Sequence, residues 1–504
     1  MAHYLFLVVA VNFIFSITYV FANNTLSFPK DFLLGASTAA YQIEGGWNES
    51  GKSENIWDRW LHENPSVVRD GSNGDIACDS LHKYKEDIKI LHDLGVDFYR
   101  FSVSWTRILP NGYANVINQE GLNYYKNLIN ELLAKGIEPF VTLYHWDHPE
   151  ILEQMGGWTN EMIVEWISDY ARVIFKELGP KVKYFATINE PLVLCSEGYG
   201  GNTAAPGKNL GSPATFLCMH NILKAHAKIY HIYDEEFRKD QNGKIGLVIP
   251  CSGLLPKNLN DTSAIDTQFQ FDCAWTAHAI FSKTGDYPEI MKNHVAENSK
   301  LAGFPRSLLP TFSPEWVQYI KGASDFFGLN HYTSRLVETV PRVEGQEWYA
   351  YSGVKESIDP SWPKSASDWL RVVPDGFRQI LNKIRKEYDN PLLYVMENGV
   401  SDKCCNIFDN SRISYLHSYM QAMLLAIYED GCNVKGYAVW SILDNFEWLA
   451  GYTERFGLVN VNFTDSNRKR TPKWSFYWYK DIIASRKLNS TTNSTELPTV
   501  IAVL

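Results

Sequence analysis

The stretch Tyr184-Phe185-Ala186-Thr187-Ile188-Asn189-Glu190-Pro191 shows the pattern that decides the fold of this chain. A short run of mostly apolar residues ends in polar side chains, and a stretch with the apolar spacing of an amphipathic helix follows it. Seven other runs have the same form: Phe32–Ala40, Asp97–Trp105, Glu138–His145, Lys244–Pro250, Asp325–Asn330, Leu392–Glu397 and Gly436–Ser441. The helical stretches are Asp79–Leu94, Glu120–Lys135, Asn160–Leu178, Pro213–Phe237, Pro374–Lys386 and Ser411–Asp430.

Eight strands that alternate with helices can close into a parallel barrel. A doubly wound sheet usually has fewer strands and a phosphate-binding glycine turn after the first one, and no GxGxxG motif follows the first run here. We find no linker and no internal repeat of solenoid period. The sequence therefore predicts an α/β protein, a single (β/α)8 TIM barrel over residues 23–486, with long loops such as Tyr332–Val373 at the carboxyl ends of its strands.

The composition fits one large globular protein. At about 150 residues per domain, 504 residues could hold three domains, but α/β barrels of this size often stay single. The chain is 45% hydrophobic and 21% charged, which provides a large core and excludes disorder as its main state. Its net charge of -10 argues against nucleic acid or an anionic membrane as the principal partner. Aromatic residues form 14% of the chain, a surplus that needs a use in the core, in a binding site, or in both.

The two ends of the chain indicate a secreted protein. The apolar run Leu5–Phe21 ends in a plausible small-residue cleavage site, so residues 1–22 are predicted to be a signal peptide. No second apolar stretch of spanning length follows, and we expect no stable membrane association. The Ser/Thr-rich residues 487–504 are predicted to be a disordered tail. Six N-x-Ser/Thr glycosylation candidates fit the secretory route, beginning at Asn23, Asn48, Asn260, Asn462, Asn489 and Asn493.

The cysteines suggest no metal site. Eight cysteines are too few for a disulfide scaffold in so long a chain, although an even count in a secreted protein permits bridges whose pairing stays open. No CxxC motif occurs, so a structural zinc is not expected, and the sequence predicts neither a metal nor a cofactor. We expect Cys195 to be a small buried hydrophobic residue.

Two predicted strands end in a carboxylate, Glu190 and Glu397. Reacting groups of such barrels lie where the strands end, and a charge directly after an apolar β-run is costly unless it is paired or functional. Two structural carboxylates held by arginine would also explain the pattern. Two glutamates facing one barrel mouth are, however, what glycoside hydrolysis needs: one protonates the leaving oxygen, and the other attacks the anomeric carbon or activates water.

The other strand ends carry groups that bind sugars. They include Gln42, Glu44, Arg100, Trp105, His145, Trp146, Asp147, Asn330, His331, Tyr332, Trp440, Glu447 and Trp448. Amide, imidazole and carboxylate groups can bind vicinal hydroxyls, while tryptophan offers a flat apolar face to a pyranose ring. Taken singly, most of these residues fit a structural role. Their concentration at the strand ends predicts a pocket for a neutral sugar.

At this point a family resemblance is evident. Residues 187–191 (TINEP) and 395–399 (VMENG) resemble the two catalytic signatures of glycoside hydrolase family 1, and the likeness runs from about Asp31 to Tyr479. It includes residues 32–45 (FLLGASTAAYQIEG), 99–105 (YRFSVSW) and 440–448 (WSILDNFEW). The segments 328–335 and 428–434 are most similar to those of insect β-glucosidases and their myrosinase relatives.

The resemblance implies a retaining β-glycosidase with assigned roles. Glu397 would be the nucleophile that forms a covalent glucosyl-enzyme, and Glu190 the acid that later acts as base. Arg100 and Tyr332 would support Glu397, and Asn189 would bind the sugar 2-hydroxyl. The remaining implied contacts are Gln42, His145, Asn330, Glu447 and Trp448 at the hydroxyls, Trp440 beneath the ring, and Trp369 on the aglycone side.

Three functional readings stay open at this point. The enzyme would act on a small-molecule β-glucoside, either O-linked or an S-linked glucosinolate, whose sulfate needs a cation such as Arg335. Ser196 offers no charge where an aphid-type myrosinase would place Lys. The third reading is a non-catalytic family 1 barrel that binds sugar or protein, but such barrels typically lose one carboxylate and this chain has both. The sequence leaves the oligomeric state open.

Overall fold

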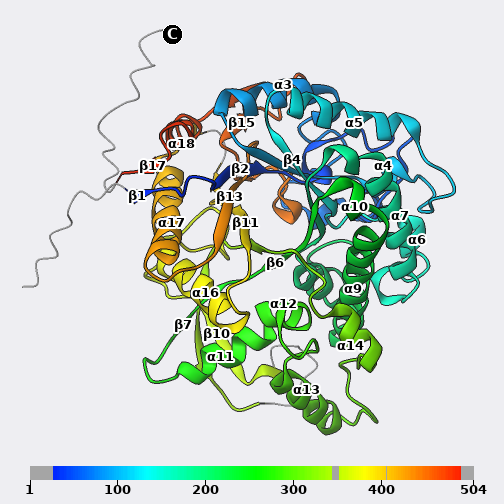
Figure 1. The fold of residues 1–504 in the computed structure, drawn as a ribbon, viewed down its shortest axis with the longest axis vertical. Helices are drawn as coiled ribbons and strands as arrows, with labels where there is room; N and C mark the ends of the chain where they lie inside the picture. Colours follow the sequence, from blue (N-terminus) through cyan, green and yellow to red (C-terminus); the bar gives the residue numbers. More distant parts are fainter. Residues whose placement is uncertain (1–25, 343–350, 404–405, 490–504) are drawn as a thin grey trace, which may run out of the picture.

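The structure is a computed structural model, and it describes residues 26–342, 351–403 and 406–489. Eight parallel strands form a closed barrel in chain order (Figure 1). They are β2 (Leu33–Ser37), β3 (Phe98–Ser102), β4 (Glu138–Tyr144), β5 (Tyr184–Asn189), β6 (Lys244–Pro250), β8 (Phe326–Asn330), β11 (Leu393–Asn398) and β13 (Val434–Trp440). Each of the eight coincides with a predicted run to within a few residues. The predicted (β/α)8 barrel is confirmed.

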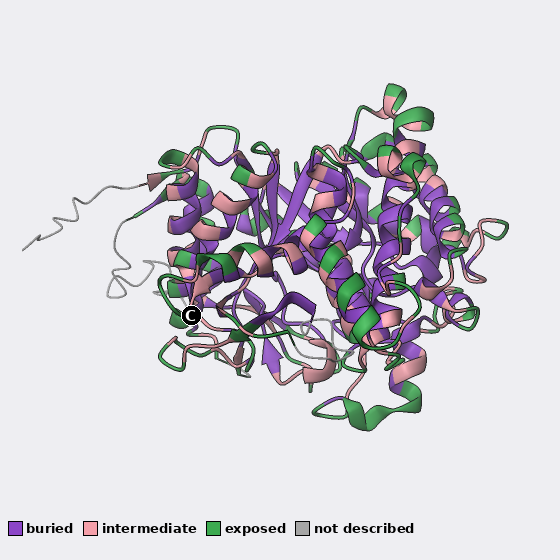
Figure 2. Ribbon diagram, turned by 90° about the horizontal axis from the view of Figure 1, so that it is seen from below, coloured by how far each residue is buried: buried purple, intermediate pink, exposed green. Residues whose placement is uncertain are grey.

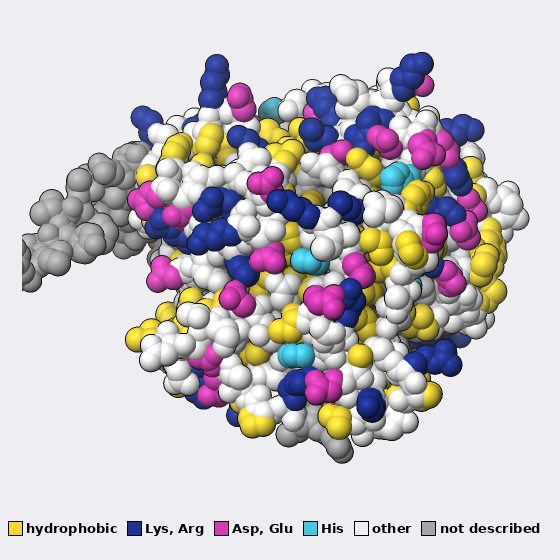
Figure 3. Space-filling view, turned by 60° about the horizontal axis from the view of Figure 1, so that its bottom comes forward, with side chains coloured by type: hydrophobic (Ala, Val, Ile, Leu, Met, Phe, Trp, Pro, Cys, Tyr) yellow, Lys and Arg dark blue, Asp and Glu magenta, His cyan; other side chains and the backbone are white. Residues whose placement is uncertain are grey.

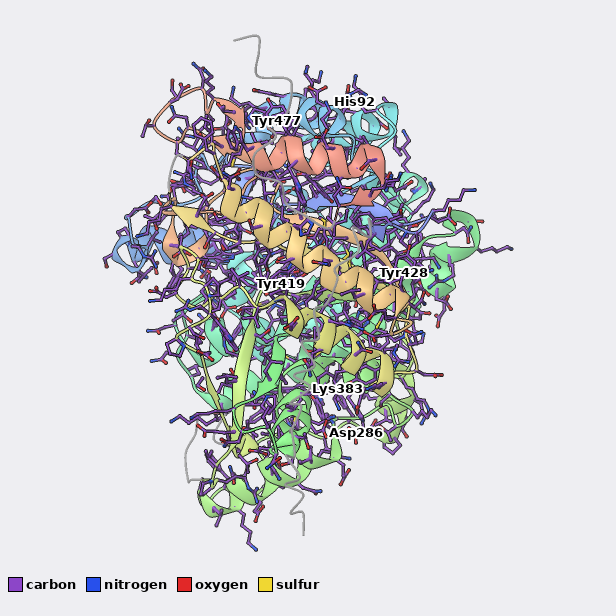
Figure 4. All side chains as sticks on the ribbon, turned by 90° about the vertical axis from the view of Figure 1, so that its left-hand side faces the viewer. His92, Asp286, Lys383, Tyr419, Tyr428 and Tyr477 are labelled. Atoms are coloured by element: carbon purple, nitrogen blue, oxygen red, sulfur yellow. A yellow bond between two sulfur atoms is a disulfide. The ribbon has the colours of Figure 1, made fainter. Side chains whose placement is uncertain are left out.

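Longer helices surround the barrel, as crossovers between its strands or, for α18, after the last strand. They are α3 (Ser80–Leu94), α5 (Gln119–Ala134), α7 (Ile163–Glu177), α9 (Ser212–Ile232), α16 (Pro374–Glu387), α17 (Asn410–Tyr428) and α18 (Trp474–Ser485). In Figure 4, α16, α17 and α18 lie next to one another on the outside of the molecule, marked by Lys383, Tyr428 and Tyr477. Short helices in the loops are α1 (Ala40–Ile43), α2 (Ile56–Glu63), α4 (Trp105–Ile108), α6 (Glu150–Glu153), α8 (Pro191–Val193) and α10 (Arg238–Gln241).

The barrel interior is a packed core. Aromatic rings from four strands close the interior near the end at which the strands begin. They are Phe98, Phe140, Phe326 and Tyr394. A much larger apolar layer lies between the strands and the surrounding helices. Figure 2 shows the strands buried and the exposed residues gathered on the outer sides of the helices. Part of the aromatic surplus is therefore core material.

Two long insertions extend the loops at the carboxyl ends of the strands. The predicted loop after β8 contains β9 (Ser334–Thr339) and β10 (Val354–Ser357), which join β7 (Gly253–Pro256) in a three-stranded sheet. A second insertion, residues 251–325, was not predicted as a long loop from the sequence. It contains β7 and the helices α11 (Thr262–Phe271), α12 (Cys273–Phe281), α13 (Glu289–Leu301) and α14 (Pro314–Ile320).

Two disulfides link segments that follow the barrel strands β5 and β6. Cys195 is bonded to Cys218, which joins the π-helical segment η4 (Leu194–Gly200) to α9, and Cys251 is bonded to Cys273 on α12. The expectation that Cys195 is only a small hydrophobic residue is therefore wrong. The pairing depends on a contact between separate elements, which spacing in the sequence does not reveal.

The two ends of the described chain meet in a small sheet. Strand β1 (Leu26–Ser27) pairs antiparallel with β17 (Lys487–Leu488), so residues 487 and 488, predicted to belong to the tail, form a strand instead. The backbone hydrogen bonds of this pairing hold both segments on the barrel. The predicted signal peptide lies outside the described residues, as do Asn23, Asn493 and residues 490–504. None of the helices within the described ranges is long and apolar enough to cross a bilayer.

The face shown in Figure 3 carries charged residues of both signs. On the face in Figure 3, Lys and Arg side chains are interspersed with Asp and Glu side chains.

Short strands complete the loops near the barrel mouth: β12 (Asp402–Lys403) pairs with β14 (Glu454–Arg455), and β15 (Val459–Val461) pairs with β16 (Arg470–Pro472).

Candidate active site

A cavity with a volume of about 570 Å³ lies at the carboxyl ends of the barrel strands. Twelve of the predicted site residues line it: Glu190, Glu397, His145, Trp146, Asn189, Asn330, Tyr332, Trp440, Glu447, Trp448, Trp369 and Arg335. Gln42 and Arg100 are not part of this lining. Arg100 contacts the lining residues Glu397 and Asn189 through hydrogen bonds. Gln42 donates a hydrogen bond to the backbone carbonyl of Phe446, next to the lining residue Glu447.

Three lining residues have a left-handed backbone, which side chains other than glycine rarely adopt. The φ angle is 44° at Glu190, 69° at Trp146 and 47° at Trp448. Glu190 follows β5 directly and precedes α8, so this conformation turns its side chain away from the line of the strand. Backbone strain of this kind gathers at functional sites, where the surrounding structure holds it in place.

Glu397 is held by two donors. The Nη1 atom of Arg100 donates to its Oε1 over 2.6 Å, and the hydroxyl of Tyr332 donates to its Oε2 over 2.6 Å. Burial and the charge of Glu397 raise the pKa of Tyr332 well above its usual value, so the hydroxyl keeps the proton it donates. Both oxygens of Glu397 thus have partners that hold its side chain in one fixed orientation.

Glu190 has different surroundings. Its Oε1 accepts one hydrogen bond, from Nδ2 of Asn330 over 2.7 Å. Burial raises the pKa of Glu190 and repulsion from Glu397 adds to the rise, while Asn330 and Arg100 oppose it. A carboxyl group with a raised pKa holds a proton that it can donate near neutral pH. The two glutamates of this cavity therefore have different surroundings.

Asn189 lies between these two groups and orients its neighbours. Its Oδ1 accepts from Nη2 of Arg100 over 2.6 Å and from Nδ2 of Asn330 over 3.2 Å. Because a guanidinium only donates, this contact fixes the orientation of the amide, and Nδ2 of Asn189 then donates to Nε2 of His145 over 3.1 Å. Burial, with a contribution from Arg100, lowers the pKa of His145 well below its usual value. His145 is therefore neutral, with its proton on Nδ1.

Four of the residues that the family resemblance places at the sugar hydroxyls have a buried polar atom without a hydrogen-bond partner among the described residues. These atoms are Oε1 of Gln42, Nδ1 of His145, Oδ1 of Asn330 and Oε2 of Glu447. The Nε2 atom of Gln42 donates to the carbonyl of Phe446 over 2.8 Å, which fixes its amide. Buried polar atoms are nearly always paired in folded proteins, so each exception needs a partner from elsewhere. Hydroxyl groups of a sugar can donate to the oxygens of Gln42, Asn330 and Glu447, and they can accept from the protonated Nδ1 of His145.

Aromatic rings form the apolar part of the cavity. The rings of Trp146 and Trp448 lie 4.9 Å apart, and His145 stacks at 21° to Trp440 with 6.0 Å between the centroids. At the mouth, Trp369 is 44% exposed and packs edge-on against Tyr332, with 5.7 Å between the rings. The cavity thus has a deep part lined by buried rings and an outer part with one accessible tryptophan.

The outer part also carries charges. The Nη1 atom of Arg335 donates to the carbonyl of Trp369 over 3.0 Å, and its Nε lies 3.9 Å from Oε2 of Glu356. Ser196 is not in the lining, and its hydroxyl donates to the carbonyl of Leu192. Sequence reasoning missed several polar lining residues, among them Arg69, Glu197, Thr203, Asp368 and Glu454. They lie in the segments that connect the barrel strands, including η4 and β14, where no strand-end pattern marks them.

Paired carboxylates of opposite character, buried polar atoms that match hydroxyls, and tryptophan rings in one barrel mouth define a glycoside-hydrolysing enzyme. The comparison with family models agrees: residues 24–488 match the model of Glycosyl hydrolase family 1. The chain belongs to this family and is a glycoside hydrolase.

Individual relatives extend this assignment. Myrosinase 1 of the aphid Brevicoryne brassicae is 46% identical over 464 residues, which are 91% of this chain and 99% of that protein. The solved structure of an aphid myrosinase superposes with a TM-score of 0.88 at 45% identity, covering 91% of this chain and 99% of the other. A mutant of the rice β-glucosidase Os3BGlu6, solved in a covalent complex with glucose, gives a TM-score of 0.85 at 36% identity, covering 90% and 99%.

Proposed function

We propose that the protein hydrolyses β-D-glucosides with retention of configuration, using Glu397 as nucleophile and Glu190 as acid and base. The observation that carries the proposal is the contrast between the two carboxyl groups. Glu397 accepts from Arg100 and Tyr332, whereas burial and the nearby negative charge raise the pKa of Glu190. The covalent glucose complex of the rice relative supports the same course of reaction.

In the first step, Glu397 attacks the anomeric carbon while the proton of Glu190 moves to the leaving oxygen or sulfur. The bond to the aglycone breaks, and the glucosyl group is held as an ester on Glu397. In the second step, Glu190 takes a proton from water, whose oxygen attacks the anomeric carbon and releases Glu397. A retaining mechanism needs the two carboxyl groups roughly 5 to 5.5 Å apart, with no room for a water between them.

The glycone is bound by the buried polar atoms. We infer that Gln42, His145, Asn330 and Glu447 take the sugar hydroxyls, because each has an unpaired atom among the described residues. Asn189 would bind the 2-hydroxyl, the contact that strengthens most in the transition state. Trp440 would lie beneath the ring, with Trp448 beside it and Trp369 on the aglycone side.

The aglycone is proposed to be O-linked or S-linked. The aphid relative is named a myrosinase, and Arg335 provides a cation at the mouth where the sulfate of a glucosinolate would lie. Two observations favour a neutral aglycone. Arg335 is already close to Glu356, and Asp368 adds negative charge to the same lining.

Loss of one catalytic carboxylate would favour the non-catalytic reading. Both are present, in one cavity, with supporting donors, so no observation favours a barrel that only binds sugar or protein.

We further propose that residues 1–22 are a signal peptide, that residues from 23 onward form the secreted barrel, and that a tail follows residue 489. Two disulfides suit an oxidising compartment. Asn48, Asn260, Asn462 and Asn489 are exposed and accessible to glycosylation. N-terminal sequencing and endoglycosidase treatment of the secreted protein test these proposals.

The function is tested by proton NMR of the first product from an aryl β-glucoside. β-Glucose as the first anomer supports retention, and α-glucose contradicts it. Turnover of cellobiose, the aryl β-glucoside and a glucosinolate on one preparation then separates the O-linked from the S-linked class.

A further inference from the structure

Glu454 lies at the cavity, and the functions proposed above do not use it. It belongs to β14, in the loop that also carries Glu447 and Trp448, and it is 5% exposed. Strand β14 is firmly held: Arg412 donates to the carbonyls of Arg455 and Phe456, both over 3.0 Å. Glu454 is thus a buried carboxylate on a fixed backbone beside the sugar site.

Its two oxygens contact two other loops of the barrel mouth. Oε1 accepts from Nη1 of Arg69 over 2.7 Å, and Oε2 accepts a short hydrogen bond from the hydroxyl of Ser367. Ser401, close after Glu397 in the chain, lies 2.7 Å from the same hydroxyl. Because a carboxylate only accepts, the proton of Ser367 goes to Glu454, and Ser401 then donates to Ser367. Such a directed chain strengthens each of its bonds.

Ser367 begins the turn that carries Trp369. The amide of Leu370 donates to the carbonyl of Ser367 over 3.1 Å, and Ser367 and Leu370 are both fully buried. Trp369 lies between them and projects into the cavity mouth against Tyr332. The turn has other bonds, including one from the amide of Ala366 to the carbonyl of Ser401, so the loss of Ser367 would shift the turn without unfolding it.

We propose that Glu454 is a positioning residue that sets the aglycone platform: through Ser367 it fixes the place of Trp369 relative to the sugar site. This rests on the proposed function, in which Trp369 contacts the aglycone. A platform displaced by a fraction of an ångström binds an aromatic aglycone less well, while a small aglycone does not reach it.

The test compares an aryl β-glucoside with methyl β-glucoside for Ser367→Ala and Glu454→Gln. For the aryl substrate, KM should rise about tenfold in Ser367→Ala and less in Glu454→Gln, which keeps an acceptor. For methyl β-glucoside, KM should stay within about twofold. Asp359→Asn is the matched control, because Asp359 lies in the same loop, accepts from Ser361 and does not line the cavity.

A double-mutant cycle with Trp369→Ala separates positioning from a general structural effect. Once Trp369 is removed, Ser367→Ala and Glu454→Gln should not raise the KM for the aryl substrate further. Equal losses on both substrates, or full effects in the Trp369→Ala background, would overturn the inference and place Glu454 in the glycone site or in folding. Failure of the wild-type protein to hydrolyse any β-glucoside would instead overturn the proposed function.

Discussion

The guanidinium of Arg100 lies 2.6 Å from the carboxylate of Glu397, measured from Nη1 to Oε1, and both side chains are buried. A buried charge that loses its partner is costly, about 3–5 kcal/mol. Arg100→Met should therefore lower the free energy of unfolding by about that amount, as measured by denaturant titration. Glu397→Gln in the same chain should restore part of it. Absence of rescue would show that Arg100 acts mainly through Asn189 or Thr142.

Tyr332→Phe removes one hydrogen bond to Glu397 and little volume. Hydrogen bonds to charged groups are worth about 1.5–3 kcal/mol, so kcat for an aryl β-glucoside should fall about 10- to 100-fold. The thermal midpoint should change little, because the rest of the ring keeps its packing. An unchanged kcat would mean that this hydrogen bond does not orient the nucleophile.

Glu190→Gln should slow hydrolysis in proportion to the need for an acid. With a poor leaving group the loss in kcat/KM should be about 10²- to 10⁴-fold, the usual contribution of a general acid, and with dinitrophenolate it should be much smaller. Since Glu190 must be protonated in the first step, wild-type kcat/KM should fall as pH rises through its raised pKa. That alkaline limb should disappear in Glu190→Gln with the activated substrate. If the alkaline limb persisted in Glu190→Gln with this substrate, the limb would belong to the titration of another group.

Asp147 gives a prediction for stability. Neither of its oxygens has a partner among the described residues, and burial raises its pKa to about 8. The folded protein then holds a proton that the unfolded chain releases above its ordinary pKa of 3.8, so stability falls as pH rises from about 4 to 8. The slope is at most about 1.4 kcal/mol per pH unit.

Asp147→Asn removes this titration. The thermal midpoint of the variant relative to wild type should therefore increase between pH 4 and pH 8 and level off above. A constant difference across that range would show that Asp147 is charged throughout.

Arg335→Gln tests the charge at the cavity mouth. If an anionic aglycone uses this cation, KM for a glucosinolate should rise about tenfold or more, while KM for an aryl β-glucoside changes little. Arg371→Gln is the control, since Arg371 is close in sequence to Trp369 but does not line the cavity. Equal effects of the two variants on the glucosinolate would exclude a specific role for Arg335.

The strand ends could be predicted from the sequence because the regular repetition of short apolar runs indicates a barrel. In a barrel, the polar residues that follow each run lie together at the carboxyl ends of the strands. This pattern predicts Glu190, Glu397 and Asn330 as candidate site residues, and the register of β11 with β8 pairs Glu397 with Asn330. Loop residues carry no such period. Glu454, Ser367 and the partner of Cys195 are defined by contacts between segments distant in the chain, so only the folded structure shows them.

The measurement that tests the central claim most directly is peptide mapping after reaction with a 2-deoxy-2-fluoro-β-glucoside, which slows the release of a covalent intermediate. The account predicts one fluoroglucosyl group per protein, attached to Glu397, and a matching loss of activity. An adduct on another residue, or steady turnover of β-glucosides by Glu397→Gln at the wild-type rate, would contradict it.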